Sequence, residues 1–350
     1  MKTSFVSNLA VQNAMRLTIQ QGQAELLKLQ TEVTTGRHAD VGLALGSSTA
    51  RSVSLQRELA RLGTLVDTNS VVTQRLAASQ SALAAMAEAA QQVRNTLVTF
   101  KGNDAADQLA IQNTEIQSAI SAFSSAANLS FNGEFLFAGI NTDVRPFNDY
   151  SAAGSTAKTT FDNALATYMS ANGIASMSDF TKAQMEDFIT NTLEPLYASD
   201  AQWAADWSDA SSQNMTSRIS TTEVVQSSAN ATTEGFRKFA LASVIALELM
   251  DENVSSEVRA YIGEAALGYV EQANTQITAE RSTLGISEAR VKKANTSLQA
   301  QIKLIKTHIT DLEGVDTYEA STRMNTLLTQ VETSYTLTSR IQRLSLIDFL

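Results

Sequence analysis

The chain has 350 residues, a formal net charge of −10 and 43% apolar residues, enough for a packed core. The acidic balance argues against a nucleic-acid partner, and the lack of cysteine excludes disulfides and thiolate metal sites. No apolar run reaches the roughly 18–20 residues of a membrane span, and the N-terminus lacks the apolar core of a secretory signal, so any export would use another kind of address.

The first hundred residues predict two long helices. Apolar residues three or four apart predict a helix from about residue 4 to residue 35, which Gly36 ends. After a short glycine-punctuated segment, the same spacing predicts a second helix from Ser47 to about Phe100. A break follows at 101–104, where Asp104 is a predicted N-cap for a helix that fades near Asn128.

The next segment differs in texture. Asn132-Gly133 predicts a hairpin turn, and residues 135–137 predict a short strand. Residues 147–235 contain eleven Asp and Glu but only three Lys and Arg, so most of the net charge lies there. We predict that this acidic insert has some core of its own, and that Trp203 and Trp207, four residues apart, belong to that core rather than to a ligand site.

The second half carries the strongest periodic signal. A helix is predicted from Phe236 to Met250, and Ser255 is positioned to cap the next helix. That helix has six consecutive heptad steps of apolar residues before it ends at Glu313-Gly314: Val270, Ile277, Leu284, Val291, Leu298, Ile305 and Leu312. A polar-rich helix of this length needs a partner, and the N-terminal helices can supply one.

A last helix is predicted from near Asp316 to the end of the chain. Its apolar residues fall mostly three or four apart: Tyr318, Met324, Leu327, Val331, Tyr335, Ile341 and Leu344. A comparable stripe on the first helix consists of Leu9, Ile19, Leu26, Leu29 and Val33. Neither helix has a partner nearby in sequence, so we predict that the two pack against each other.

Together these elements predict a mainly α fold: a long antiparallel helical bundle or coiled coil formed by the N- and C-terminal segments. A β-hairpin and a small inserted mixed α/β domain complete it. We predict three parts. Residues 1–45 with 315–350 form a terminal coiled-coil domain, residues 46–146 with 236–314 form a helical rod with the Phe-rich hairpin, and residues 147–235 form the acidic insert.

No convincing constellation of catalytic, cofactor-binding or metal-ligating residues occurs. The two histidines, His38 and His308, lie in different elements, and no phosphate loop or nucleophile motif is found. We therefore predict no enzyme activity, no cofactor and no metal. A basic cluster late in the long helix is either a solvated face or a complement to acidic neighbours in a polymer: Arg290, Lys292, Lys293, Lys303 and Lys306.

Three segments resemble the bacterial flagellin superfamily and, within it, the hook-associated protein 3 family. QAELLKLQTEVTTGR, ending at Arg37, is similar to the heptad helix and Gly-Lys/Arg turn of the superfamily. GEFLFAGINTDVRPF, residues 133–147, resembles the G-x-Y-x-F-A-G-x-x-T-x-x-x-P-F segment of the hook-associated protein 3 family, called the junction family below. Ser334-Tyr335 and the closing LSLIDFL resemble that family's C-terminus, whereas the turn after Arg37 departs from its Asp-Asp-Pro-like pattern.

The resemblance implies a structural adapter at the hook–filament junction that assembles into a ring with copies of itself. Its implied partners are hook-associated proteins on the hook side, flagellin on the filament side and an export chaperone, with neither nucleic acid nor membrane. It would be extracellular, secreted by the flagellar type III route. Filament flagellin is the near alternative; a coiled-coil signalling protein and an enzyme in the acidic insert are more distant ones.

The terminal stripes supply the predicted assembly interface. Its residues are Leu9, Ile19, Leu26, Val33, Leu327, Val331, Tyr335, Ile341, Leu344, Leu346 and Phe349.

Overall fold

The computed structural model describes residues 8–99, 105–250 and 253–347. Their fold is mainly α-helical, with two short antiparallel hairpins of strands, which confirms the predicted fold class. The chain divides into two compact units, residues 1–64 with 298–350 and residues 65–297. Two long helices, α3 (Thr49–Thr99) and α10 (Ser256–Glu313), contribute residues to both units.

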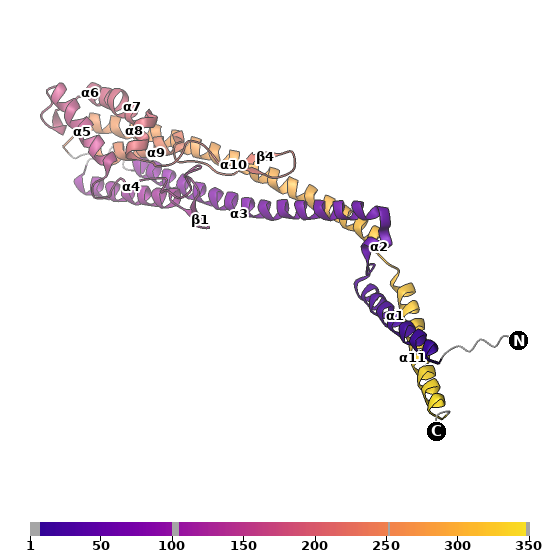
Figure 1. The fold of residues 1–350 in the computed structure, drawn as a ribbon. Helices are drawn as coiled ribbons and strands as arrows, with labels where there is room; N and C mark the ends of the chain where they lie inside the picture. The colour runs from indigo at the N-terminus through magenta and orange to yellow at the C-terminus, as the bar shows by residue number, and fades with distance from the viewer. Residues whose placement is uncertain (1–7, 100–104, 251–252, 348–350) are drawn as a thin grey trace. The chain divides into compact units, whose positions relative to one another are not determined.

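The first unit holds the two terminal helices, α1 (Asn8–Thr35) and α11 (Thr317–Ile347), which lie side by side (Figure 1). Gly36 ends α1 as predicted: its φ is 69°, and its amide donates to the Glu32 carbonyl at 2.8 Å. Helix α2 (Val41–Leu45) and a 3₁₀ turn, η1 (Gly46–Ser48), then lead into α3. The predicted helix start near residue 4 lies outside the described residues.

In the second unit, α3 and α10 run antiparallel. Gln80 Nε2 donates to the Arg281 carbonyl at 2.6 Å, and Arg94 Nε lies 3.2 Å from a carboxylate oxygen of Glu271. The predicted heptad positions of α10 are buried from residue 270 to residue 298, and the last two, at 305 and 312, are half-buried. Ser255 caps α10 as predicted, since its Oγ accepts from the Val258 amide at 3.4 Å.

The Phe-rich hairpin forms around Asn132 and Gly133, both with positive φ, as their sequence predicts. Strand β1 (Ser130–Phe131) pairs with β2 (Glu134–Phe135). The prediction of a strand over residues 135–137 is wrong beyond Phe135, because the backbone of the next residues turns into the core. There the Phe137 carbonyl accepts from the Ala231 amide at 2.8 Å.

Helix α4 (Ala106–Ala127) precedes this hairpin, and α9 (Glu234–Val244) with the π-helical segment η4 (Ile245–Leu249) follows the insert. Ala105 stands at the N-cap of α4 and makes no side-chain cap, and the predicted cap Asp104 lies outside the described residues. The helix predicted over 236–250 starts two residues earlier and changes to π-helical geometry halfway.

The acidic insert is built mostly of short helices. In order they are α5 (Thr156–Ala171), η2 (Met177–Asp179), α6 (Lys182–Asp187), η3 (Phe188–Leu193), α7 (Glu194–Ala198) and α8 (Asp200–Asp206). The strands β3 (Thr216–Arg218) and β4 (Val224–Gln226) form its antiparallel hairpin. Trp203 and Trp207 are buried and stack with ring centroids 5.6 Å apart, which confirms their predicted place in a core.

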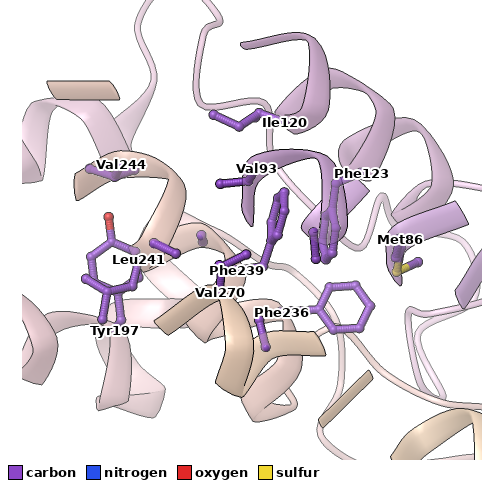
Figure 2. Packing of buried hydrophobic residues seen from close by; sticks show 14 of the residues in the cluster. Met86, Val93, Ile120, Phe123, Tyr197, Phe236, Phe239, Leu241, Val244 and Val270 are labelled. Atoms are coloured by element: carbon purple, nitrogen blue, oxygen red, sulfur yellow. The ribbon is translucent and has the colours of Figure 1, made fainter. Parts of the chain in front are cut away.

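The core of the insert is continuous with that of the surrounding helices. Phe123 of α4 stacks on Phe239 of α9 with ring centroids 3.8 Å apart, and Phe236 meets Phe123 edge-on (Figure 2). Phe147 contacts both Phe123 and Trp203 and so joins the two groups of aromatic side chains. The second unit therefore has one shared aromatic core.

Candidate assembly surface on the terminal helices

A narrow apolar seam joins α1 to α11. Its residues fall three or four positions apart on both helices, as expected of an antiparallel coiled coil, and are buried or half-buried. On α1 they are Val11, Met15, Ile19, Gly22, Leu26, Leu29 and Val33; on α11 they are Ala320, Met324, Leu327, Val331, Ser334 and Thr338. The predicted packing of the two terminal helices against each other is confirmed.

The helices approach each other closely at Gly22. A Cβ atom at this position would lie 2.8 Å from Val331 Cγ2, so any larger residue would force the valine side chain or the helix to shift. Next to this contact the Gln23 side-chain amide donates to the Tyr335 hydroxyl, and Thr338 Oγ1 lies 3.7 Å from Met15 Sδ. The seam thus pairs a small residue, Gly22, with a larger one, Val331, and side-chain contacts at its edge add polar interactions.

The predicted interface residues take different places. Ile19, Leu26, Val33, Leu327 and Val331 line the intrachain seam. Tyr335 lies at its edge and is about half exposed. Four others, Leu9, Ile341, Leu344 and Leu346, lie in α1 and α11, but their side chains are outside the described part of the structure, and Phe349 is outside it altogether. Whether any of these residues meets another copy stays a prediction.

One residue of the predicted α11 stripe is misplaced. Tyr318 is 83% exposed, because it lies two positions before the seam residue Ala320 and therefore points to the opposite side of the helix. The seam instead uses Ala320, Ser334 and Thr338, small or polar side chains that the apolar pattern did not single out.

The structure also shows apolar side chains that face away from the seam. On α1, Leu17 and Leu27 are 55% and 64% exposed, and on α11, Leu328 and Leu337 are 44% and 49% exposed. Each lies one or two positions away from a seam residue, so neither helix can bury them against the other. The sequence-based prediction did not include these leucines, although a search for apolar residues outside the heptad pattern would have found them.

A shallow groove of about 400 Å³ opens on the same helix pair. It is lined by Arg16, Ile19 and Gln20 of α1 and by Tyr335, Thr338 and Ser339 of α11. The charges around it are sparse: α1 carries two acidic and two basic residues, and α11 carries two acidic and three basic ones. Two such surfaces can meet with little net repulsion, in contrast to the acidic insert.

A cleft of about 550 Å³ lies at the start of α9 in the second unit. Partial burial would raise the pKa of Glu194, but hydrogen bonds from Lys238 and from the Tyr269 hydroxyl outweigh it and hold that pKa below its usual value. Arg237 donates to the carbonyls of Tyr197 and Thr232. These polar groups thus tie α7, α9 and α10 together, whereas burial raises the pKa of the neighbouring Glu280 carboxyl.

Within residues 8–99, 105–250 and 253–347, no three metal-ligating side chains cluster. His38 faces Glu32, with Nδ1 3.6 Å from a carboxylate oxygen, and His308 lies in α10. No helix in this part of the chain has the length and apolar character needed to cross a membrane.

Comparisons with known proteins match both ends of the chain. Residues 6–142 match the bacterial flagellin N-terminal helical region, and residues 267–350 match the bacterial flagellin C-terminal helical region. The two matches together span well over half of the chain, which belongs to the flagellin family. The family makes the protein a structural component of the bacterial flagellum. A search of curated proteins finds no significant match.

A solved structure from Vibrio parahaemolyticus, provisionally named a flagellar hook-associated protein, has a similar fold. It superposes with a TM-score of 0.53 at 12% sequence identity and covers 76% of this chain and 97% of its own. At this identity the likeness concerns the fold alone.

Proposed function

We propose that the chain is an adapter at the hook–filament junction, of the hook-associated protein 3 type, and that its copies assemble into a ring. The observation that carries self-assembly is the set of outward leucines on α1 and α11: Leu17, Leu27, Leu328 and Leu337. The seam between α1 and α11 is already packed within the chain, so it leaves no place for these leucines. Burying them between copies would contribute about 25 cal/mol per Å² of apolar surface, and a repeated head-to-tail contact closes into a ring.

The junction role is supported by the segment GEFLFAGINTDVRPF, residues 133–147, which resembles that of the junction family. The structure gives its central glycine a physical reason. Gly139 has a φ of 64°, and a Cβ there would lie 2.4 Å from the Ser211 carbonyl oxygen and 2.6 Å from that of Gln213. The segment thus packs against residues 211–213 of the acidic insert, and its Phe137 carbonyl accepts from the Ala231 amide near the end of the insert.

In this proposal the three predicted parts have separate tasks. Residues 1–45 with 315–350 assemble into the inner tube, residues 46–146 with 236–314 form the rod, and residues 147–235 face outward. The ring contacts hook-associated proteins on one side and flagellin on the other. An export chaperone holds the C-terminal helix before the chain leaves by the flagellar type III route to its extracellular place.

Deleting the gene in the producing bacterium tests the role. For an adapter we expect hooks without filaments and flagellin spilled into the medium, both restored by the wild-type gene. The near alternative, a filament flagellin, predicts instead that no flagellin subunit reaches the medium. That outcome, or normal filaments on the deletion strain, would contradict the adapter role.

A leucine variant tests self-assembly separately. We expect Leu17→Gln/Leu27→Gln/Leu328→Gln/Leu337→Gln to weaken association of the purified chain by on the order of tenfold or more in sedimentation velocity, because each buried leucine contributes on the order of 1.5–3 kcal/mol. The control is Ile286→Gln/Leu304→Gln, two side chains of α10 that are 63% and 59% exposed. Equal association of both variants would contradict the proposed surface.

A further inference from the structure

Four helices, α1, α3, α10 and α11, begin or end near one joint in the first unit. We define this joint as residues 35–40 and 313–316 with Ser52 and Gln56 of α3. Here Arg37 and Gly314 form an antiparallel β-bridge. On either side of it, the His38 amide donates to the Glu313 carbonyl at 2.9 Å, and the Val315 amide donates to the Gly36 carbonyl at 3.0 Å. The end of α1 is therefore held to the start of α11 by paired backbone groups.

Glu313 is the buried charge of this joint, with 1% of its side chain exposed. One carboxylate oxygen accepts from the Ser52 hydroxyl and, at 2.7 Å, from Gln56 Nε2, both on the first turns of α3. The other lies 3.3 Å from the guanidinium of Arg37. A buried carboxylate needs such partners, and removing the carboxylate leaves the donor groups of those partners without an acceptor. Glu313 thus links the end of α10 to α3 and to the connection that follows α1.

Gly314 makes the joint possible. A Cβ there would lie 2.4 Å from the Thr310 carbonyl oxygen, to which the Gly314 amide donates at 2.8 Å. Asp316 then starts α11, because its Oδ1 accepts from the Tyr318 amide at 2.8 Å. Asp316, three residues after the last residue of α10, thus starts the helix that runs alongside α1.

Beyond the joint, the heptad spacing of the seam does not by itself fix the register, although the close approach of Gly22 to Val331 favours the observed one. A heptad seam that slips by seven residues still places apolar side chains opposite one another. Such a slip would set Met15 or Leu29 opposite Val331 in place of Gly22. In the observed register the two helices advance almost in step from the joint: Arg37 faces Gly314, and Gly22, fifteen residues earlier, faces Val331, seventeen residues later.

We infer that Glu313 is a positioning residue, and that through Arg37, Ser52 and Gln56 it fixes the register in which α1 and α11 pair. At the joint, hydrogen bonds tie the connections of both terminal helices to α3 and α10, so the register is set from the joint outward. The inference concerns the single chain and does not depend on assembly.

Cross-linking of cysteine pairs tests it, since the chain has no cysteine of its own. The in-register pair is Gly22→Cys with Val331→Cys, and the slipped reporters are Met15→Cys or Leu29→Cys with Val331→Cys. Positions seven residues from the facing one are about 10.5 Å away along the helix, too far for a disulfide. All pairs are oxidised at concentrations where sedimentation shows a monomer, so failure of the proposed assembly cannot affect the result.

With Glu313 present we expect only the in-register disulfide. Glu313→Ala should lower its yield severalfold and raise that of a slipped pair, whereas Glu332→Ala, which removes an exposed carboxylate of α11, should change neither. Arg37→Ala, at a half-exposed position, repeats the test without emptying a buried site. Exclusive formation of the in-register disulfide in both Glu313→Ala and Arg37→Ala would overturn the inference.

Discussion

The aromatic core of the second unit and the seam between the terminal helices are built by opposite means. Around Phe123, Phe236 and Phe239 large rings interlock, and the acidic insert supplies Trp203 to the same core. The terminal seam has one narrow stripe that includes glycine, serine and threonine, while leucines on the outer faces stay exposed. The aromatic core is completed within the chain, whereas the outward leucines of the terminal helices stay exposed and are free to meet another molecule.

Because of this difference, we expect the stability of the terminal helices, unlike that of the aromatic core, to depend on assembly. Because folding free energies are small differences between large terms, a helix pair that leaves apolar side chains exposed opens more easily than a closed core. The terminal helices should therefore be the labile part of the monomer, and association should protect them.

The largest effect is expected for Phe123→Ala. It removes a fully buried ring that contacts three other aromatic side chains, at a cost of about 3–5 kcal/mol. Denaturant unfolding followed by tryptophan fluorescence should show the loss, since both tryptophans lie in this core. Fluorescence unfolding that stays as in the wild type would show that the aromatic core does not hold the unit together.

Gly139→Ala should cost about 2–3 kcal/mol in the same measurement, because it combines a left-handed backbone with a clash against two carbonyl oxygens. Gly173→Ala is the matched control: it has a similar φ of 66°, but nothing lies within 4 Å of its added Cβ. We expect about 1 kcal/mol for the control. Equal losses would mean that the contact with residues 211–213 is dispensable.

Gly22→Leu should act on the terminal pair alone. The side chain would collide with Val331 and separate α1 from α11, at about 1–3 kcal/mol, and leave tryptophan fluorescence unfolding unchanged. Gly63→Leu in α3, where no atom lies near the added Cβ, should be neutral or slightly stabilising. Helical content during thermal unfolding distinguishes them, and a stabilised terminal pair in Gly22→Leu would refute the close approach.

The smallest effects are expected for two carboxyl groups of the same cleft, Glu280 and Glu194, whose pKa values are shifted in opposite directions. The pKa of Glu280 is raised, so its ionisation opposes folding above that pKa and ceases to do so as the pH falls below its ordinary value. Glu280→Gln should therefore raise Tm by about 1–3 °C at pH 7 and leave it unchanged near pH 4.

Glu194→Gln should do the reverse, because the pKa of Glu194 is lowered. Its ionised form stabilises the fold above the ordinary pKa, and this contribution is lost as the pH falls through the lowered value. The variant should melt lower at pH 7, and the gap should shrink in acid. Calorimetry at the two pH values checks both signs, and two variants that shift together would contradict the assigned environments.

Long-range periodicity predicted most of the fold. The heptads of α10, the helix end at Gly36, the hairpin turn at Asn132-Gly133 and the pairing of the terminal helices all follow from local spacing and backbone preference. The first three need no knowledge of what lies elsewhere in the chain, and the pairing was predicted from the matching apolar stripes at the two ends, so one sequence suffices to find them.

Features that depend on contacts between distant residues were missed. The strand predicted over 135–137 stops early because Phe137 pairs with Ala231, about a hundred residues later. Tyr318 is apolar enough for a stripe but points away from the seam that Ala320 joins. Ser52 and Gln56, which donate to the buried Glu313 carboxylate, lie more than 250 residues away along the chain, and no local pattern marks them.

Hydrogen exchange of the backbone amides, compared between the dilute monomer and the assembled protein, tests the central claim most directly. In the monomer we expect amides of α1 and α11 to exchange far faster than those of α4 and α9, and assembly should slow exchange chiefly in the two terminal helices. Terminal helices as protected as α9 in the monomer, or unchanged by assembly, would contradict the claim that their outer faces are completed by other copies.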